Sequence, residues 1–223
     1  KINTYVELGN AKDYCITNGI RIINHSVAWL NAAFYDGTGP ICNIANDAYA
    51  HGILWVNAAG NYADTHYQAT LTDTNSDTKH EFSGMDQALS LYASAGSTIE
   101  VLMNWNAYPT TKVDYNLYLY NIDPDINPGA AAVASSTISQ GPVARPPTED
   151  LVYTTPSAGT YYLVVKKKST STANLPFDLY FFGVSSLQYK NKESSLAQPA
   201  DASGVLAVGA VTMTDALEGF SSR

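Results

Sequence analysis

Ile53-Leu-Trp-Val-Asn-Ala-Ala-Gly-Asn61 is the stretch that decides the fold of this chain. An apolar run of this length, bounded by glycine, predicts a strand buried on both faces of a parallel sheet. The small residues at its end would let another chain lie close to the backbone. Asn61 follows the strand, where its amide N–H can reach a bound carbonyl as an oxyanion donor does. The alternative is a tight turn closed by Gly60 and Asn61.

Composition narrows the class of protein. The length of 223 residues suits one large domain or two small ones. Charged residues make up 14% of the chain, below the usual quarter, and the abundant Tyr and Thr favour strands. A net charge of −8 argues against a nucleic-acid partner, which would need a basic face. No apolar run approaches the roughly 18 residues of a membrane span. Cys15 and Cys42 leave one disulfide or two free thiols equally open.

Helices and strands alternate in the first 61 residues. Residues 4–17 predict an amphipathic helix that ends at Asn18-Gly19, and its expected apolar stripe is Tyr5, Leu8, Ala11, Tyr14 and Cys15. A strand is expected over 20–27. A second helix is expected over 41–50, with Ile41, Ile44, Ala45, Ala48 and Tyr49 as its stripe, and His51-Gly52 ends it. This order predicts parallel strands with right-handed crossovers, and residues 205–211 predict a further buried strand.

The middle of the chain has a different pattern. Residues 62–82 are polar, and from about 88 to 183 short strands alternate with turn residues. Residues 98–105, 114–120, 160–165 and 177–182 predict strands, and in 114–120 one face should carry Tyr115, Leu117 and Leu119. This spacing favours an antiparallel β-sandwich or jelly roll. Residues 128–148, rich in Pro, Ala, Ser and Gly, predict a long surface loop.

Three segments, in order, resemble the subtilisin-like serine peptidases. Residues 18–27, Asn-Gly-Ile-Arg-Ile-Ile-Asn-His-Ser-Val, look like the family's Asn-Gly-x-x-Val-Ile-Asn-x-Ser-Leu strand. Residues 52–61 are similar to Gly-x-x-x-Val-x-Ala-Ala-Gly-Asn. Pro199, residues 205–211 and Phe220-Ser-Ser222 look like the family's substrate-side proline, Val-Ile-x-Val-Gly-Ala strand and Phe-Ser-Ser turn. The match covers 1–61 and 186–223. It implies a partial subtilisin-like parallel sheet with flanking helices, interrupted by an inserted β-sandwich at 62–185.

The resemblance also implies roles for individual residues. Asn61 matches the oxyanion-hole asparagine of the family. Ser26, Val27 and Ala28 match the strand edge that pairs with the substrate backbone. Ala58, Ala59 and Gly60 match the far wall of the main side-chain pocket. Peptides bind such sites by adding a strand to an open edge with small residues beside it. At Ala28-Trp29 the family usually has glycines, and a Cβ at this position would narrow the substrate channel.

The catalytic triad of the family is missing. Neither His-Gly-Thr nor Gly-Thr-Ser occurs in the chain. His51-Gly52 is expected to be a helix cap, and His25 matches a variable family position. His66 and His80 lie in polar sequence that predicts loops, and no second ligand lies at the spacing of a metal-binding motif. A nucleophilic serine needs a base and an orienting acid beside it, so the chain should not hydrolyse peptides by itself. We expect part of a secreted serine endopeptidase that acts on peptide or protein substrates.

Residues 84–183 resemble the β-sandwich of the bacterial pre-peptidase C-terminal type, on the strands at 114–120, 149–153 and 156–165. The sandwich could shape the substrate approach, bind a partner or act as a folded spacer. The alternative function is a non-catalytic protein- or carbohydrate-binding module on a degenerate peptidase scaffold. No cofactor is expected, although residues 123–127 and 73–77 could supply oxygen ligands for Ca²⁺ or form ordinary turns. Missing strands would leave apolar sheet surface uncovered, so self-association is expected.

Overall fold

The computed structural model describes residues 2–141, 143–171 and 173–223. The chain forms two compact units, one made of the residues up to Ala63 with Lys192–Arg223 and the other of Asp64–Asn191. The fold is mostly sheet with two helices, and both parallel and antiparallel sheets occur. The sequence placed residues 186–191 with the first unit. In the structure the short strand β11 (Ser186–Leu187) pairs with a strand of the second unit, so this segment belongs there.

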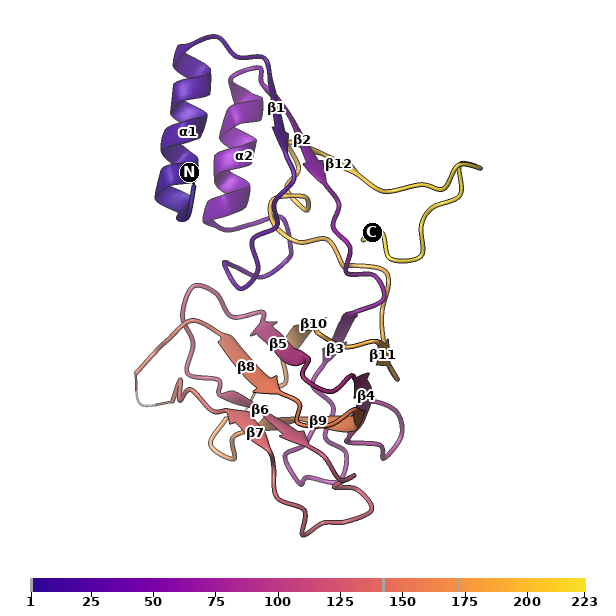
Figure 1. Ribbon diagram of the computed structural model, residues 1–223. Helices are drawn as coiled ribbons and strands as arrows, with labels where there is room; N and C mark the ends of the chain where they lie inside the picture. Colours follow the sequence, from indigo (N-terminus) through magenta and orange to yellow (C-terminus); the bar gives the residue numbers. More distant parts are fainter. Residues whose placement is uncertain (1, 142, 172) are drawn as a thin grey trace. The chain divides into compact units, whose positions relative to one another are not determined.

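The first unit is a three-stranded parallel sheet with two helices. Its strands are β1 (Ile22–His25), β2 (Leu54–Ala58) and β12 (Val205–Val208), in the order β1-β2-β12. Helix α1 (Tyr5–Thr17) precedes β1, and α2 (Pro40–Ala50) lies between β1 and β2 in the chain. Figure 1 shows the three strands side by side with both helices next to them. The predicted helix-strand-helix-strand order and the parallel pairing are confirmed.

The helix boundaries follow their caps. Thr4 and Glu7 form a reciprocal capping box at the start of α1, and Asn18 with Gly19 at a φ of +67° ends the helix as predicted. His51 caps α2, also as predicted. The predicted apolar stripes are partly wrong, because the side chains of Tyr5, Tyr14 and Tyr49 are exposed. These tyrosines lie beside the faces that the helices bury, and those faces carry Leu8 in α1 and Ile41, Cys42, Ala45 and Ala48 in α2.

The parallel sheet is covered on one face. Trp55 and Ile53 are buried in a cluster with residues of both helices. The opposite face carries apolar side chains that stay in solvent, namely Ile22, Leu54, Leu206 and Val208. The prediction of a strand buried on both faces is therefore wrong for β2, whose residues alternate between exposed and buried. Alternation of this kind is what a sheet with one solvated face produces.

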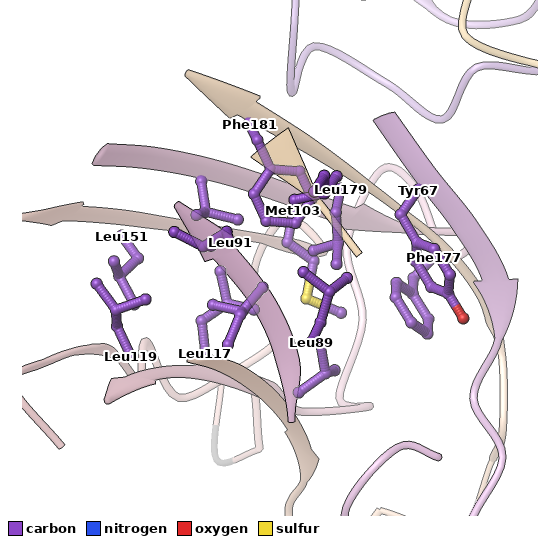
Figure 2. Packing of buried hydrophobic residues seen from close by; sticks show 14 of the residues in the cluster. Tyr67, Leu89, Leu91, Met103, Leu117, Leu119, Leu151, Phe177, Leu179 and Phe181 are labelled. Carbon is purple, nitrogen blue, oxygen red and sulfur yellow. The ribbon is translucent and has the colours of Figure 1, made fainter. Parts of the chain in front are cut away.

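The second unit consists of two antiparallel sheets. One has the order β3-β10-β5-β8 and the other β11-β4-β9-β6-β7. Their strands are β3 (His66–Thr70), β4 (Leu89–Ala93), β5 (Thr98–Trp105), β6 (Tyr115–Tyr120), β7 (Ala134–Ser136), β8 (Thr148–Thr154), β9 (Gly159–Lys167) and β10 (Pro176–Phe182). Side chains from both sheets meet in one core (Figure 2). Tyr115, Leu117 and Leu119 point inward from β6, as the alternation predicted.

Two loop predictions in this unit are wrong. Strand β7 lies inside the segment 128–148. Strand β3 lies inside the polar segment 62–82, and it buries His66 completely. The His66 Nε2 atom lies 2.9 Å from Asp178 Oδ1, and its Nδ1 lies 2.9 Å from the Asn191 carbonyl. The Asn191 carbonyl accepts from Nδ1, and the buried Asp178 carboxyl shares a proton with Nε2, so both ring nitrogens have a partner inside the core. A polar residue inside the core thus made its strand look like a loop.

The two cysteines do not form a disulfide. Cys15 and Cys42 are both free thiols. Cys42 is buried, and its Sγ donates to the Asp201 carboxylate at 3.3 Å. Burial and the nearby carboxylate raise the pKa of the Cys42 thiol, so this residue is an inert part of the core.

Over the described ranges, none of the helices has the length and apolar character needed to cross a membrane.

Candidate functional site

A groove opens where β1 and β2 end. It has a volume of about 150 Å³ and is lined by Ser26, Val27, Ala28, Ala58, Gly60, Asn61 and Tyr62. Six of the seven predicted site residues therefore come together, although residues 29–57 separate the two walls along the chain. Ala59 does not line the groove, because it is buried and its N–H donates to the Val208 carbonyl. Tyr62 was missed, since only its position next to Asn61 distinguishes it in the sequence.

The wall that carries Asn61 is held by a sharp turn after β2. Gly60 has a φ of +109°, and a Cβ there would lie 2.9 Å from the Tyr62 ring and 3.0 Å from Ser222 Oγ. The Ser222 N–H donates to the Gly60 carbonyl, and the Tyr62 N–H donates to Ser222 Oγ at 2.9 Å. The Phe-Ser-Ser segment thus fixes the turn, and the turn leaves Asn61 exposed at the groove. Within the described ranges, the Asn61 side chain forms no hydrogen bond with another protein group.

The other wall is anchored through Trp29 and Gln198. The Trp29 N–H donates to the Gln198 carbonyl at 2.8 Å, next to the predicted substrate-side proline Pro199. The buried Gln198 side chain donates to the carbonyls of Thr38 at 2.8 Å and Phe34 at 3.2 Å. These contacts connect the segment after β1 to the loop before α2. They leave the edge at residues 26–28 outside regular pairing, as a strand edge that receives a peptide must be.

The electrostatics of the groove are those of an uncharged site. None of its lining residues carries a charge at neutral pH. Burial raises the pKa of Tyr62, so its hydroxyl stays protonated. His25 lies on β1 next to this wall, and burial lowers the pKa of its ring. A neutral groove with an amide donor at its mouth suits an uncharged peptide segment and can stabilise developing negative charge on a carbonyl oxygen.

The groove is lined by the Asn61 amide and the Ser26 hydroxyl, and none of its lining residues is an acid or a base that could activate a nucleophile. His66 and Asp178 form a histidine–carboxylate pair, but both side chains are inaccessible to solvent, so they cannot act on a substrate. Elsewhere in the described ranges, no three His, Cys, Asp or Glu side chains come together to hold a metal ion. Asp123 accepts from the Asp125 N–H, and Asp73 accepts from the N–H groups of Asp77 and Thr78. These are turn contacts, and the calcium hypothesis for the two segments stays a prediction.

Comparison with known proteins gives a structural relative. No protein-family model and no curated protein matches the chain. Among solved structures, the chain is similar to the CspB protease of Clostridium perfringens, with 15% sequence identity and a TM-score of 0.64. The similarity covers 100% of this chain and 50% of that protease, so the chain spans half the length of its relative. At this identity the similarity concerns the fold, and the fold is one that a protease uses.

Proposed function

We propose that this chain carries the oxyanion donor and part of the substrate cleft of a subtilisin-like serine endopeptidase that acts on peptide or protein substrates. The observation that carries the proposal is the exposed Asn61 side chain at the mouth of a groove between two parallel strand ends. The fold similarity to a protease supports it. The triad would come from outside these residues, and the second unit would be an inserted β-sandwich or jelly roll. Secretion is part of the same proposal.

The first experiment uses the chain as it is. An uncharged, blocked tetrapeptide is titrated into the ¹⁵N-labelled protein and followed by NMR. We expect shifts of the amide signals at residues 26–28 and 60–62 and of the Asn61 side chain, with no hydrolysis, because the chain lacks nucleophile and base. Shifts confined to other residues, or genuine turnover of the peptide, would contradict the proposal.

The second experiment concerns catalysis in a protein that contains this chain together with a Ser-His-Asp triad. Asn61→Ala should lower kcat by roughly 10²–10³-fold, the loss that follows removal of one oxyanion donor in peptidases of this kind, and should change KM little. The control is Asn24→Ala, which makes the same change at an exposed residue of β1. An Asn61→Ala variant with undiminished kcat would exclude the oxyanion role.

A second candidate function is glycan or protein binding by the second unit on a degenerate peptidase scaffold. A depression of about 480 Å³ lies on that unit, and it is lined mainly by polar side chains, among them Asn116, Tyr118, Lys166, Lys167 and Lys168. Three lysines, one amide and a tyrosine provide hydrogen-bond donors that suit an acidic saccharide. Titration with a uronic-acid oligosaccharide tests this candidate. Heat and NMR shifts at β6 and β9 would support it, and their absence would exclude acidic-saccharide binding at this depression.

A further inference from the structure

Asn57 is a buried amide beside the groove that contacts both of its walls. It is 1% exposed and ends the β1–β2 register, opposite His25. Its Nδ2 donates to the Ala58 carbonyl at 2.8 Å and, over a longer distance of 3.5 Å, to the Val27 carbonyl. Val27 and Ala58 are lining residues of the two opposite walls. The side chain of Asn57 therefore joins the walls where the backbone pairing of the two strands stops.

The orientation of this amide follows from its partners. Carbonyl oxygens only accept hydrogen bonds, so the nitrogen of Asn57 faces them and its Oδ1 faces His25. His25 Nδ1 lies 2.6 Å from that Oδ1, so Nδ1 carries a proton and donates it. The indole N–H of Trp55 donates to the same oxygen at 3.5 Å, and its rings meet the His25 ring edge-on at a centroid distance of 5.4 Å. All hydrogen-bonding groups of the Asn57 amide face a partner.

The two walls differ in how firmly they are held. On the Ala58 side, β2 continues into backbone pairing with β12 and into the turn fixed by Ser222. On the Val27 side, the register with β2 has already ended, and Trp29 is the next residue with a backbone partner outside the groove. Between those two points, the Asn57 amide is the link to the opposite wall. The separation of the walls at the groove thus depends on this side chain and on the ring that orients it.

We infer that Asn57 and His25 are positioning residues that set the width of the groove, and so select the size of the peptide side chain it accepts. Neither residue lines the groove, so neither touches the peptide. The inference rests on the proposed peptide-binding function of this groove. A wider groove admits a larger peptide side chain. In an apolar pocket, one methylene more or less in the ligand changes the preference between two ligands by roughly 10-fold or more.

The test compares two peptides that differ in one side chain. Acetyl-Ala-Ala-Val-Ala-amide and acetyl-Ala-Ala-Val-Leu-amide are titrated into the ¹⁵N-labelled protein, and the ratio of their dissociation constants is measured by NMR. His25→Leu removes the donor to Asn57, whereas His25→Asn places an amide N–H near the original Nδ1 position. Asn57→Asp removes the donor to both carbonyls, and Asn24→Asp makes the same change on the exposed face of β1.

We expect His25→Leu and Asn57→Asp to shift the affinity ratio by about fivefold toward the leucine peptide. His25→Asn and Asn24→Asp should leave the ratio within about twofold of the parent protein. A loss of folding would weaken both peptides by the same factor, so the ratio separates a change in width from instability. An unchanged ratio in His25→Leu and Asn57→Asp overturns the inference while peptide binding stands. Failure of the parent protein to bind either peptide overturns the proposed function instead.

Discussion

The two units of this protein bury their apolar residues in different ways. The second unit closes two sheets around one core, in which Trp105, Tyr115 and Leu117 are fully buried. The first unit covers one face of its sheet with helices and leaves Leu54 and Leu206 about half exposed on the other. This contrast predicts that the second unit contributes most of the stability and that the first unit has the more open apolar surface. The enclosed core should dominate unfolding, while the open sheet and the groove beside it offer surface to other molecules.

The largest expected difference is between two leucines. Leu117→Ala removes a side chain that is 0% exposed and should cost about 3.5 kcal/mol of unfolding free energy, since a buried cavity remains. Leu206→Ala removes one that is 53% exposed and should cost less than about 0.5 kcal/mol. Urea unfolding followed by circular dichroism measures both. Similar losses in the two variants would show that the sheet face of the first unit is covered in solution.

The next contrast uses two histidines. His80 Nδ1 accepts from the Thr72 N–H and its Nε2 faces the Tyr67 hydroxyl, so the buried ring is neutral, and burial lowers its pKa to about 4. The unfolded chain binds the proton near pH 6.5, so stability should fall as the pH drops from 6.5 to 4. The loss is about 3 kcal/mol at 1.36 kcal/mol per pKa unit.

His80→Asn should remove this part of the pH dependence, whereas the same substitution at the exposed cap residue His51 should not. Urea unfolding midpoints measured at intervals from pH 7 to pH 4 give the pH dependence of stability for each variant. If His80→Asn and the parent protein lost stability in parallel, the titration of another group would have to explain the loss.

A third contrast uses two glycines with positive φ. Gly60→Ala should cost about 2 kcal/mol, because the new Cβ meets the Tyr62 ring and Ser222 Oγ in addition to the backbone strain. Gly96, at a φ of +74° in the second unit, has nothing within 4 Å of its Cβ position, so Gly96→Ala should cost about 1 kcal/mol. Hydrogen exchange of the β2 amides should accelerate only in Gly60→Ala. Equal costs for the two variants would mean that the turn after β2 can widen freely.

The smallest expected effect concerns self-association through the open sheet face. Leu206→Lys introduces a charge into the apolar surface formed with Ile22, Leu54 and Val208, and should weaken self-association at least about tenfold, or 1.4 kcal/mol. Val152→Lys introduces the same charge at an exposed residue of β8 in the second unit and should have no effect. Sedimentation velocity over a concentration series distinguishes them. A parent protein that stays monomeric throughout would refute self-association.

Local signals in the sequence predicted the elements that depend on nearby residues. The stop at Asn18-Gly19, the cap at His51 and the inward face of β6 are set by neighbours within a few positions. Strand β3 was not predicted because the residue that pairs with its buried His66 lies far away in the sequence. Asp178 pairs with the His66 ring from a distant part of the chain, and no pattern around residue 66 reveals that partner. Asn57 was missed for the same reason, since its role depends on His25 and Val27 across the sheet.

The sequence by itself determined both helices and most of the strands, and its motifs indicated which short segments to expect at a site. Only the tertiary structure decided that the ends of β1 and β2 meet in a groove, that Ala59 turns away from it, and that one sheet face stays exposed. The reason is physical. Backbone conformation responds to adjacent residues, whereas burial and hydrogen-bond partners depend on which distant layers and strands are packed alongside.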